Sequence, residues 1–251
     1  MVNFVGAGCG AADLITLRGK KLLENADVII YAGSLVNPEL LQYAKVGCQI
    51  HNSAYMTLDE VISVMENAEK EGKNTVRLHT GDPSLYGAIR EQMDRLDKLS
   101  VAYKICPGVS SLCGAAAAIK AEYTLPGVSQ TVIITRMAGR TAVPERESIE
   151  SLAAHGSTMV VFLSSGMLSE LSHRLISGGY RHETPAAIVY KASWSDEKIC
   201  RCTVGTLSET AEKNGIKKTA LITVGEFLGS NYELSRLYDK SFETEFRKAE
   251  R

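Results

Sequence analysis

The chain has 251 residues, of which 45% are hydrophobic and 23% charged, and its formal net charge is -1. These values fit a globular protein of one large or two compact domains. They argue against nucleic acid as a partner, which would require a basic excess or stripe. No apolar run reaches transmembrane length, and the N-terminal residues enter a strand pattern without a secretory signal, so we expect a cytoplasmic protein with no membrane association.

Short runs rich in β-branched residues alternate with helical patterns along the whole chain. The predicted strands are Val2 to Val5, Val28 to Tyr31, Thr75 to His79, Ala102 to Cys106, Thr131 to Thr135, Met159 to Leu163, Ala186 to Tyr190, Ile199 to Val204 and Ala220 to Val224. Alternation of strands and helices is typical of α/β architecture, and it predicts substantially parallel sheets.

The helix expected after Thr57 has the clearest local signals. Thr57 and Glu60 have the spacing of a capping box, apolar residues follow at helical intervals, and Gly72 ends the pattern. Pro38 is expected to begin a short helix, at the position that tolerates its missing N–H.

A domain boundary is expected near residues 119–130, where Pro126 and Gly127 interrupt the periodicity before a second series of strands and helices begins. We therefore predict two α/β domains, residues 1–120 and 121–251, with a cleft between them. Clefts at domain interfaces are preferred sites for small molecules.

The first glycine loop, Gly6-Ala-Gly8-Cys-Gly10-Ala11, follows the first strand and satisfies one form of the dinucleotide fingerprint. An NAD-dependent oxidoreductase would also need an acid at the end of the second strand to hold the ribose hydroxyls. That strand ends Ile29-Ile-Tyr31-Ala-Gly-Ser34, with no acid, and Asp27 lies at its other end. The three glycines still require a tight turn with close approach of the backbone, which leaves a ligand other than a dinucleotide as an open alternative.

The second loop, His79-Thr-Gly-Asp-Pro-Ser-Leu-Tyr-Gly87, lies at the carboxyl end of another predicted strand. Ligands of open α/β sheets bind at this edge. Gly81 allows a ligand to approach the backbone, and Pro83 fixes a rigid turn. An ordinary strand-to-helix turn, with Asp82 capping the next helix, is the alternative.

Metal-binding patterns are not evident. The six cysteines are scattered, with Cys200 and Cys202 forming only a C-x-C pair, and the five histidines show no ligand spacing. We expect reduced thiols and no protein-bound metal. A lone histidine at position 79 is expected to be structural.

Four separated segments together resemble the tetrapyrrole methylases, the S-adenosylmethionine-dependent enzymes of corrin and sirohaem synthesis. They are Phe4 to Thr16, Tyr31-Ala-Gly-Ser-Leu-Val36, Thr80 to Gly87, and Pro107-Gly-Val-Ser-Ser111. Glu122 to Gln130, Ile133 to Arg136, Lys218 to Gly229 and Ser235 to Tyr238 extend the resemblance over nearly the whole chain. Two departures are Cys9 and Ser195, where the family tends to proline; Cys9 puts the turn geometry of the first loop in question.

The resemblance implies a methyl transfer from S-adenosylmethionine to a corrin-ring carbon, a reaction whose main demand is positioning. It implies that the cofactor is held by residues of both domains, with Leu163, Ala192 and Ala220 in the second. The implied cofactor contacts are Cys9, Thr80, Gly81, Asp82, Leu85, Ser110, Ser111, Leu163, Ala192 and Ala220. No catalytic residue is assigned, and Asp82 is the candidate for positioning. The resemblance also implies a homodimer.

A tetrapyrrole acceptor carries many carboxylates, so its site needs cations although the chain is nearly neutral. The candidate substrate contacts are Tyr31, Ser34, Tyr86, Arg90, Arg136, Arg140 and Lys191; the alternative for each cation, a solvated surface charge, is the more common case. Any cobalt would arrive inside the substrate. Methylation at another ring position, or a non-enzymatic tetrapyrrole- or nucleotide-binding module, are the alternatives.

Overall fold

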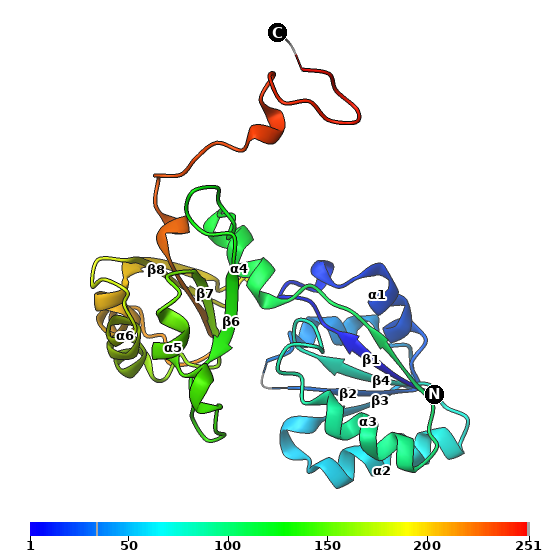
Figure 1. Ribbon diagram of the computed structural model, residues 1–251. Helices are drawn as coiled ribbons and strands as arrows, with labels where there is room; N and C mark the ends of the chain where they lie inside the picture. Colours follow the sequence, from blue (N-terminus) through cyan, green and yellow to red (C-terminus); the bar gives the residue numbers. More distant parts are fainter. Residues whose placement is uncertain (34, 250–251) are drawn as a thin grey trace. The chain divides into compact units, whose positions relative to one another are not determined.

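The computed structural model describes residues 1–33 and 35–249. Contacts divide the chain into two compact units, which are described here one at a time. Unit 1 comprises Met1–Ala118 and Lys191–Lys198, and unit 2 comprises Ile119–Tyr190 and the chain from Ile199 onward. Each unit contains one five-stranded sheet with helices packed on it (Figure 1).

Unit 1 is built on an all-parallel sheet with the strand order β3-β2-β4-β1-β5. Its strands are β1 (Val2–Gly6), β2 (Val28–Tyr31), β3 (Gln49–Asn52), β4 (Thr75–His79) and β5 (Tyr103–Cys106). Its helices are α1 (Leu17–Glu24), α2 (Leu58–Lys70), α3 (Ile89–Lys98) and α4 (Ser111–Ile119), the last of which runs to the boundary with unit 2.

Helices cover both faces of this sheet, with α1 on one side and α2 and α3 on the other (Figure 1). Alternate residues of each strand feed two apolar layers. Val5, Ile29 and Leu78 lie in the layer that includes Leu23 of α1, whereas Phe4 lies in the opposite layer. Burial on both faces explains why β2, Val28-Ile-Ile-Tyr31, is a continuous apolar run.

The local signals of α2 are confirmed. The Glu60 N–H donates to Thr57 Oγ1 at 3.3 Å and the Thr57 N–H donates to Glu60 Oε2 at 2.7 Å, which completes the capping box. The expected apolar stripe is buried against the sheet. Pro38 begins a short 3-10 helix, Pro38–Tyr43, as predicted.

Unit 2 departs from the predicted parallel arrangement. Its sheet has the order β6-β7-β10-β8-β9, and only the pairing of β6 with β7 is parallel among those whose direction is resolved; β10 runs antiparallel to both β7 and β8. The strands are β6 (Val132–Arg136), β7 (Thr158–Phe162), β8 (Pro185–Tyr190), β9 (Lys198–Thr203) and β10 (Ala220–Val224).

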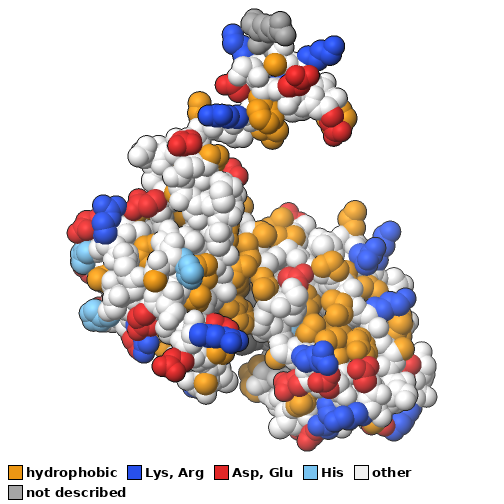
Figure 2. Space-filling model, viewed as in Figure 1, with side chains coloured by type: hydrophobic (Ala, Val, Ile, Leu, Met, Phe, Trp, Pro, Cys, Tyr) orange, Lys and Arg blue, Asp and Glu red, His pale blue; other side chains and the backbone are white. Residues whose placement is uncertain are grey.

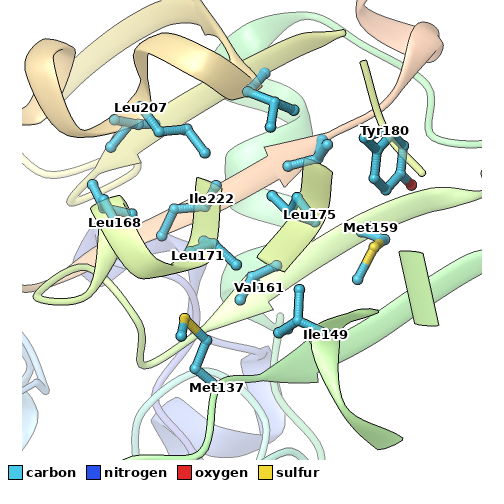
Figure 3. Packing of buried hydrophobic residues seen from close by; sticks show 14 of the residues in the cluster. Met137, Ile149, Met159, Val161, Leu168, Leu171, Leu175, Tyr180, Leu207 and Ile222 are labelled. Atoms are coloured by element: carbon cyan, nitrogen blue, oxygen red, sulfur yellow. The ribbon is translucent and has the colours of Figure 1, made fainter. Parts of the chain in front are cut away.

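Three helices of unit 2, α5 (Ile149–Ala153), α6 (Leu168–Ser177) and α7 (Leu207–Lys213), supply side chains to its core. Leu171 and Leu175 of α6 pack with Val161 of β7 and Ile222 of β10 (Figure 3). Further 3-10 helices span Ala12–Leu14, Ser53–Tyr55, Glu145–Glu147, Val204–Thr206, Glu226–Leu228 and Arg236–Tyr238.

The surface carries acidic and basic side chains next to one another on the face seen in Figure 2, with no single-sign stripe on that face. Among the helices of the described residues, none is long and apolar enough to cross a membrane.

Candidate functional site

The two glycine loops lie side by side in unit 1, at the point where the sheet topology reverses. The connection from β1 leads to β2, beyond β4, whereas the connection from β4 leads to β5, beyond β1. The two connections leave in opposite directions, and ligands of open α/β sheets bind at such a switch point. The loops after β1 and β4 are Gly6 to Ala11 and Thr80 to Gly87.

Backbone hydrogen bonds join these two loops directly. The Gly81 N–H donates to Gly8 O at 3.0 Å, and the Gly8 N–H donates to Gly81 O at 3.3 Å. Both glycines have positive φ, +84° at Gly8 and +62° at Gly81, a region that side chains disfavour. Glycine at these positions is therefore required by conformation.

The loop after β5 meets the same point. A Cβ on Gly6 would lie 2.5 Å from Gly108 Cα and 2.6 Å from Gly81 O. Ser110 and Ser111 follow Gly108 in the chain, and their backbone lies close to Gly81. A Cβ added to Gly81 would be in ordinary contact with it, 3.4 Å from Ser111 N and 3.5 Å from Ser110 Cα. The loops after three strands thus pack backbone against backbone at one place.

Asp82 joins the loop after β4 to the loop after β5 and does not cap a helix. Its Oδ1 accepts from the Ser84 N–H at 2.8 Å, and its Oδ2 accepts from the Gly108 N–H at 2.8 Å. Partial burial opposes ionisation, but the hydrogen bonds from Ser84 and Gly108 outweigh it and lower the pKa of Asp82. The helix-cap alternative is wrong because α3 begins after Ala88, whose side chain cannot cap it.

Two buried polar atoms beside the loop have no hydrogen-bond partner among the described residues: Thr80 Oγ1 and His79 Nε2. Buried polar atoms are normally paired, so a polar ligand could satisfy the Thr80 hydroxyl. Burial, aided by the charge of Arg77, lowers the pKa of His79 to about 3, which keeps its imidazole neutral near pH 7. His79 is therefore no cation in this site.

The segment Lys191–Lys198, called the strap below, packs on the first glycine loop within unit 1. Ser193 Oγ accepts from the Ala11 N–H at 3.0 Å, and a Cβ on Gly10 would lie 2.6 Å from that same oxygen. Ala192, which we expected to lie in the second domain, is therefore part of unit 1. The chain returns there because Gly10 leaves room for it.

Cys9 is buried between the glycine loop, the strap and α4. Its Sγ lies 3.8 Å from Ser193 Oγ, and a Cβ on Gly114 would be 2.7 Å from Cys9 Cβ. Burial raises the pKa of Cys9 despite the hydrogen bond to Ser193, so the thiol stays protonated. Cys9 therefore acts here as a small packing residue.

Leu163 and Ala220, the other predicted cofactor contacts, lie in unit 2 and share one edge of its sheet. Ser165, two residues after Leu163, links them, because its Oγ donates a hydrogen bond to Ala220 O at 3.3 Å. Leu163 itself has a φ of +52° and is 59% exposed. A bulky residue held in that region at an exposed strand end is a candidate for ligand contact.

The predicted substrate residues that the structure describes have different surroundings. Arg136 donates to the carbonyl oxygens of Met137, Thr141 and Ala142, so its guanidinium closes its own loop. Arg140 lies exposed in that loop. The side chain of Arg90 pairs with Asp94 at 2.8 Å on the surface of α3.

Lys191 pairs with Asp196 at 2.6 Å and lies 4.9 Å from the centre of the Trp194 ring. Tyr31 packs half-buried at the end of β2, and Tyr86 is 42% exposed with a φ of +55°. Ser34 lies outside the described residues. Among the residues that the structure describes, no group of three or more His, Cys, Asp or Glu side chains could hold a metal ion.

Two residues that were not predicted as site residues stabilise the first loop. Ser193 bonds to it as described, and Asn37 Nδ2 donates to Gly10 O at 3.1 Å. Asn37 immediately precedes Pro38, and its role as a helix cap was the only local signal it offered. Gly108 belongs to the segment Pro107 to Ser111 but was not itself predicted as a site residue. Its proximity to Gly6 depends on the pairing of β5 with β1.

Comparisons with known proteins extend over the whole chain. A family model described as Tetrapyrrole (Corrin/Porphyrin) Methylases matches residues 1–208. The cobalt-precorrin-4 C(11)-methyltransferase of Methanocaldococcus jannaschii is 58% identical over 249 residues, which cover 99% of this chain and 96% of the relative. The precorrin-4 C(11)-methyltransferase of a Sinorhizobium species is 42% identical over 248 residues, 98% of each chain.

Solved structures agree. The X-ray structure of a cobalamin biosynthetic enzyme, cobalt precorrin-4 methyltransferase, matches with a TM-score of 0.89 and 46% identity, over 91% of this chain and 96% of that one. A uroporphyrin-III C-methyl transferase from Thermus thermophilus, in complex with S-adenosylhomocysteine, has the same fold with a TM-score of 0.74 and 24% identity, over 90% of this chain and 98% of that one.

Proposed function

This chain belongs to the tetrapyrrole (corrin/porphyrin) methylases, and we propose that it transfers a methyl group from S-adenosylmethionine to C11 of cobalt-precorrin-4 in cobalamin biosynthesis. Membership of the family confirms the predicted fold class, the enzyme class and the cofactor. S-adenosylmethionine is not a dinucleotide, so this cofactor is consistent with the missing ribose-binding acid at the end of the second strand.

The observation that carries the proposal is the 58% identity, over nearly the full length of both chains, to a relative named cobalt-precorrin-4 C(11)-methyltransferase. The relative named for precorrin-4, without cobalt, is 42% identical over a similar length. This difference supports the cobalt complex as the substrate.

The residues at the switch point fit S-adenosylmethionine. Gly8 and Gly108 allow the loops to pack closely, since an added Cβ would lie 2.7 Å from Leu14 O and 2.2 Å from Gly81 O, and the buried Thr80 hydroxyl has no protein partner among the described residues. Ser110 and Ser111 stand at the start of α4, where backbone N–H groups favour a polar or anionic group. When bound, the cofactor would supply a methyl group attached to a sulfonium sulfur. The sulfur leaves readily as a neutral thioether when the methyl group is transferred.

The contribution of the protein to this reaction is positioning. In our proposal, the cofactor contacts are Thr80, Gly81, Leu85, Ser110, Ser111, Cys9 and Ala192, and Leu163 and Ala220 are proposed as further contacts. The bonds from Asp82 to Ser84 and Gly108 fix the loop that carries the first three of these residues. No proton transfer by a side chain is invoked.

For the carboxylates of the acceptor, Arg140, Arg90 and Lys191 are the proposed cations, with Tyr31, Ser34 and Tyr86 as further polar contacts. Since Arg136 is bound to the carbonyl oxygens of the loop that carries Arg140, we propose that it shapes this loop instead of meeting the substrate directly. Charge-assisted hydrogen bonds from arginine suit carboxylates.

The decisive experiment supplies the purified protein with cobalt-precorrin-4 and, separately, precorrin-4, together with S-adenosylmethionine labelled with ¹³C in the methyl group. Carbon NMR of the product should place the label at C11, with faster turnover of the cobalt complex. Label at another ring carbon would disprove the C11 assignment while retaining a corrin methylase; no labelled product from either acceptor would disprove the proposal.

Calorimetry with S-adenosylhomocysteine and with NAD tests the cofactor separately. We expect binding of the first and none of the second. Binding of neither ligand would favour the non-enzymatic module, and binding of NAD alone would restore the oxidoreductase.

We also propose a homodimer located in the cytoplasm. The dimer is supported by exposed apolar side chains near the C-terminus, such as Leu234, Tyr238 and Phe246. The cytoplasmic location is supported by six free cysteines, which are typical of a reducing compartment. Light scattering during gel filtration should give twice the 27.2 kDa mass of the chain, and a monomer would contradict the dimer.

A further inference from the structure

A buried polar pair lies beneath the second glycine loop, on the face of the unit 1 sheet covered by α2 and α3. It consists of Arg77 in β4 and Gln92 in α3, which are 7% and 5% exposed. Among the described residues, no acidic side chain forms an ion pair with Arg77. A buried guanidinium without a carboxylate is unusual, because burial disfavours an unpaired charge.

Neutral oxygens take the place of the missing acid. Arg77 Nε donates to Gln92 Oε1 at 3.1 Å, and Arg77 Nη1 donates to Ile30 O at 3.2 Å, near the end of β2. Burial lowers the pKa of Arg77 to about 10, so the group remains charged near neutral pH. The charge orients the amide of Gln92, because only the carbonyl end of that amide can accept from it.

The other end of the amide reaches the loop. Gln92 Nε2 donates to Ala88 O at 3.0 Å. Ala88 begins α3 in the left-handed region, with a φ of +49° and no side-chain cap, and Tyr86 is left-handed as well. Two residues with side chains in that region require support from their surroundings.

The two ends of the loop are therefore held differently. The entry, at Gly81 and Asp82, is joined to Gly8 and Gly108 by the bonds described above. The exit, at Tyr86 to Ala88, is joined to the sheet through Gln92 and Arg77. We infer that Arg77 and Gln92 are positioning residues, which hold the exit of the loop so that Thr80 to Leu85 keep the conformation that binds the cofactor. This inference rests on the proposed cofactor site.

Gln92→Glu separates positioning from simple packing. The carboxylate keeps the shape of the side chain and supplies the acid that Arg77 lacks, so thermal stability should be equal to or higher than that of the wild type. It cannot donate to Ala88 O, however, and the loop exit loses its tie. Arg77→Met removes the orienting charge instead, and Gln49→Glu, at an exposed position of β3, is the matched charge control.

Three readouts are expected to move together in Gln92→Glu. Affinity for S-adenosylhomocysteine, measured by calorimetry, should fall about three- to tenfold, the size of one lost hydrogen bond. The KM for S-adenosylmethionine should rise by a similar factor with kcat nearly unchanged, and amide hydrogen exchange in the free protein should accelerate at residues 86–89. Arg77→Met should show the same pattern, and Gln49→Glu none of it.

Wild-type affinity together with wild-type exchange at residues 86–89 in Gln92→Glu would overturn the inference and leave the pair a packing feature. Failure of the wild-type protein to bind S-adenosylhomocysteine would instead overturn the proposed function, and the inference with it. Because exchange is measured without ligand, the two failures are distinguishable.

Discussion

The two sheets of this protein contain the same number of strands but are organised for different tasks. In unit 1 all resolved pairings are parallel, so every strand ends at the same edge, and three loops meet there within contact distance at Gly6, Gly81 and Gly108. In unit 2 the antiparallel β10 divides the strand ends between both edges. A parallel sheet concentrates backbone groups at one edge, whereas the mixed sheet leaves that edge with fewer loop ends.

This comparison predicts that an added methyl group is far more damaging at the converging loops than at an open glycine near the strand ends of unit 2. Gly6→Ala adds a Cβ that would lie 2.5 Å from Gly108 Cα, with backbone on both sides. We expect a loss of about 3 kcal/mol of stability and a drop of at least about a hundredfold in affinity for S-adenosylhomocysteine. Denaturant unfolding and calorimetry measure both.

The control for that variant is Gly166→Ala in unit 2, where the nearest atom to the added Cβ would be Lys217 O at 3.7 Å. Its stability should change by less than about 0.5 kcal/mol. Equal losses in the two variants would refute the contrast between the sheets.

The buried imidazole of His79 should make unit 1 sensitive to acid. Its pKa is lowered to about 3 by burial and by Arg77, whereas in the unfolded chain it titrates normally near 6.5. Below that value the unfolded state binds the extra proton, so stability falls with falling pH by up to about 1.4 kcal/mol per unit until pH 3.

His79→Phe, which keeps a ring beside Phe4, should flatten the decline of the melting temperature between pH 6.5 and pH 4. His155→Gln, at an exposed position of unit 2, is the control and should retain the wild-type slope. An unchanged slope in His79→Phe would show that other groups control the acid response.

A smaller effect is expected from Asp82→Asn. The amide can still accept from Ser84, but it presents a donor or a weaker acceptor to the Gly108 N–H, so the tie between two loops weakens. Affinity for S-adenosylhomocysteine should fall about tenfold, with a fold that remains intact by circular dichroism. If Asp82→Ala retained both binding and turnover, the second loop would not be the cofactor site.

The smallest effect belongs to the surface of unit 2. Arg174 pairs with Glu150 at 3.0 Å and with Glu170 at 2.6 Å, linking α5 to α6. Since these groups are partly exposed, Arg174→Met should lower stability by less than about 1 kcal/mol and leave cofactor affinity unchanged. Weakened binding in this variant would indicate that the two units are coupled more strongly than their separate cores suggest.

Local patterns predicted most of the strands and the two glycine loops, because apolar runs and turn residues are properties of short segments. β3 was missed: Gln49-Ile-His-Asn52 has only one large apolar residue and lies at the sheet edge, where burial imposes little pattern. The prediction of substantially parallel strands was wrong in unit 2 for another reason: alternation of strands and helices does not determine which strands become neighbours.

The predicted cofactor contacts were identified from sequence motifs, whereas the hydrogen bonds that hold them in place became evident only from the fold. Asp82 was recognised as important, yet its bond to Gly108 depends on the neighbouring loop, far along the chain. Ser193 offered no local signal, because its hydroxyl acts on a loop that precedes it by some 180 residues. Such tertiary fastenings are invisible to spacing and periodicity.

The strap also affects the order in which the molecule can be completed during synthesis. The chain leaves unit 1 after Ala118, returns for Lys191–Lys198, and leaves again. At about 5–20 residues per second, a ribosome needs some 4–16 s to add the 80 residues from 118 to 198 (198 minus 118). Throughout that interval all five strands of unit 1 have been synthesised, but the segment that covers its first glycine loop is incomplete. Trp194, the single tryptophan of the chain, arrives with that segment, so its fluorescence would report the moment at which the loop is closed.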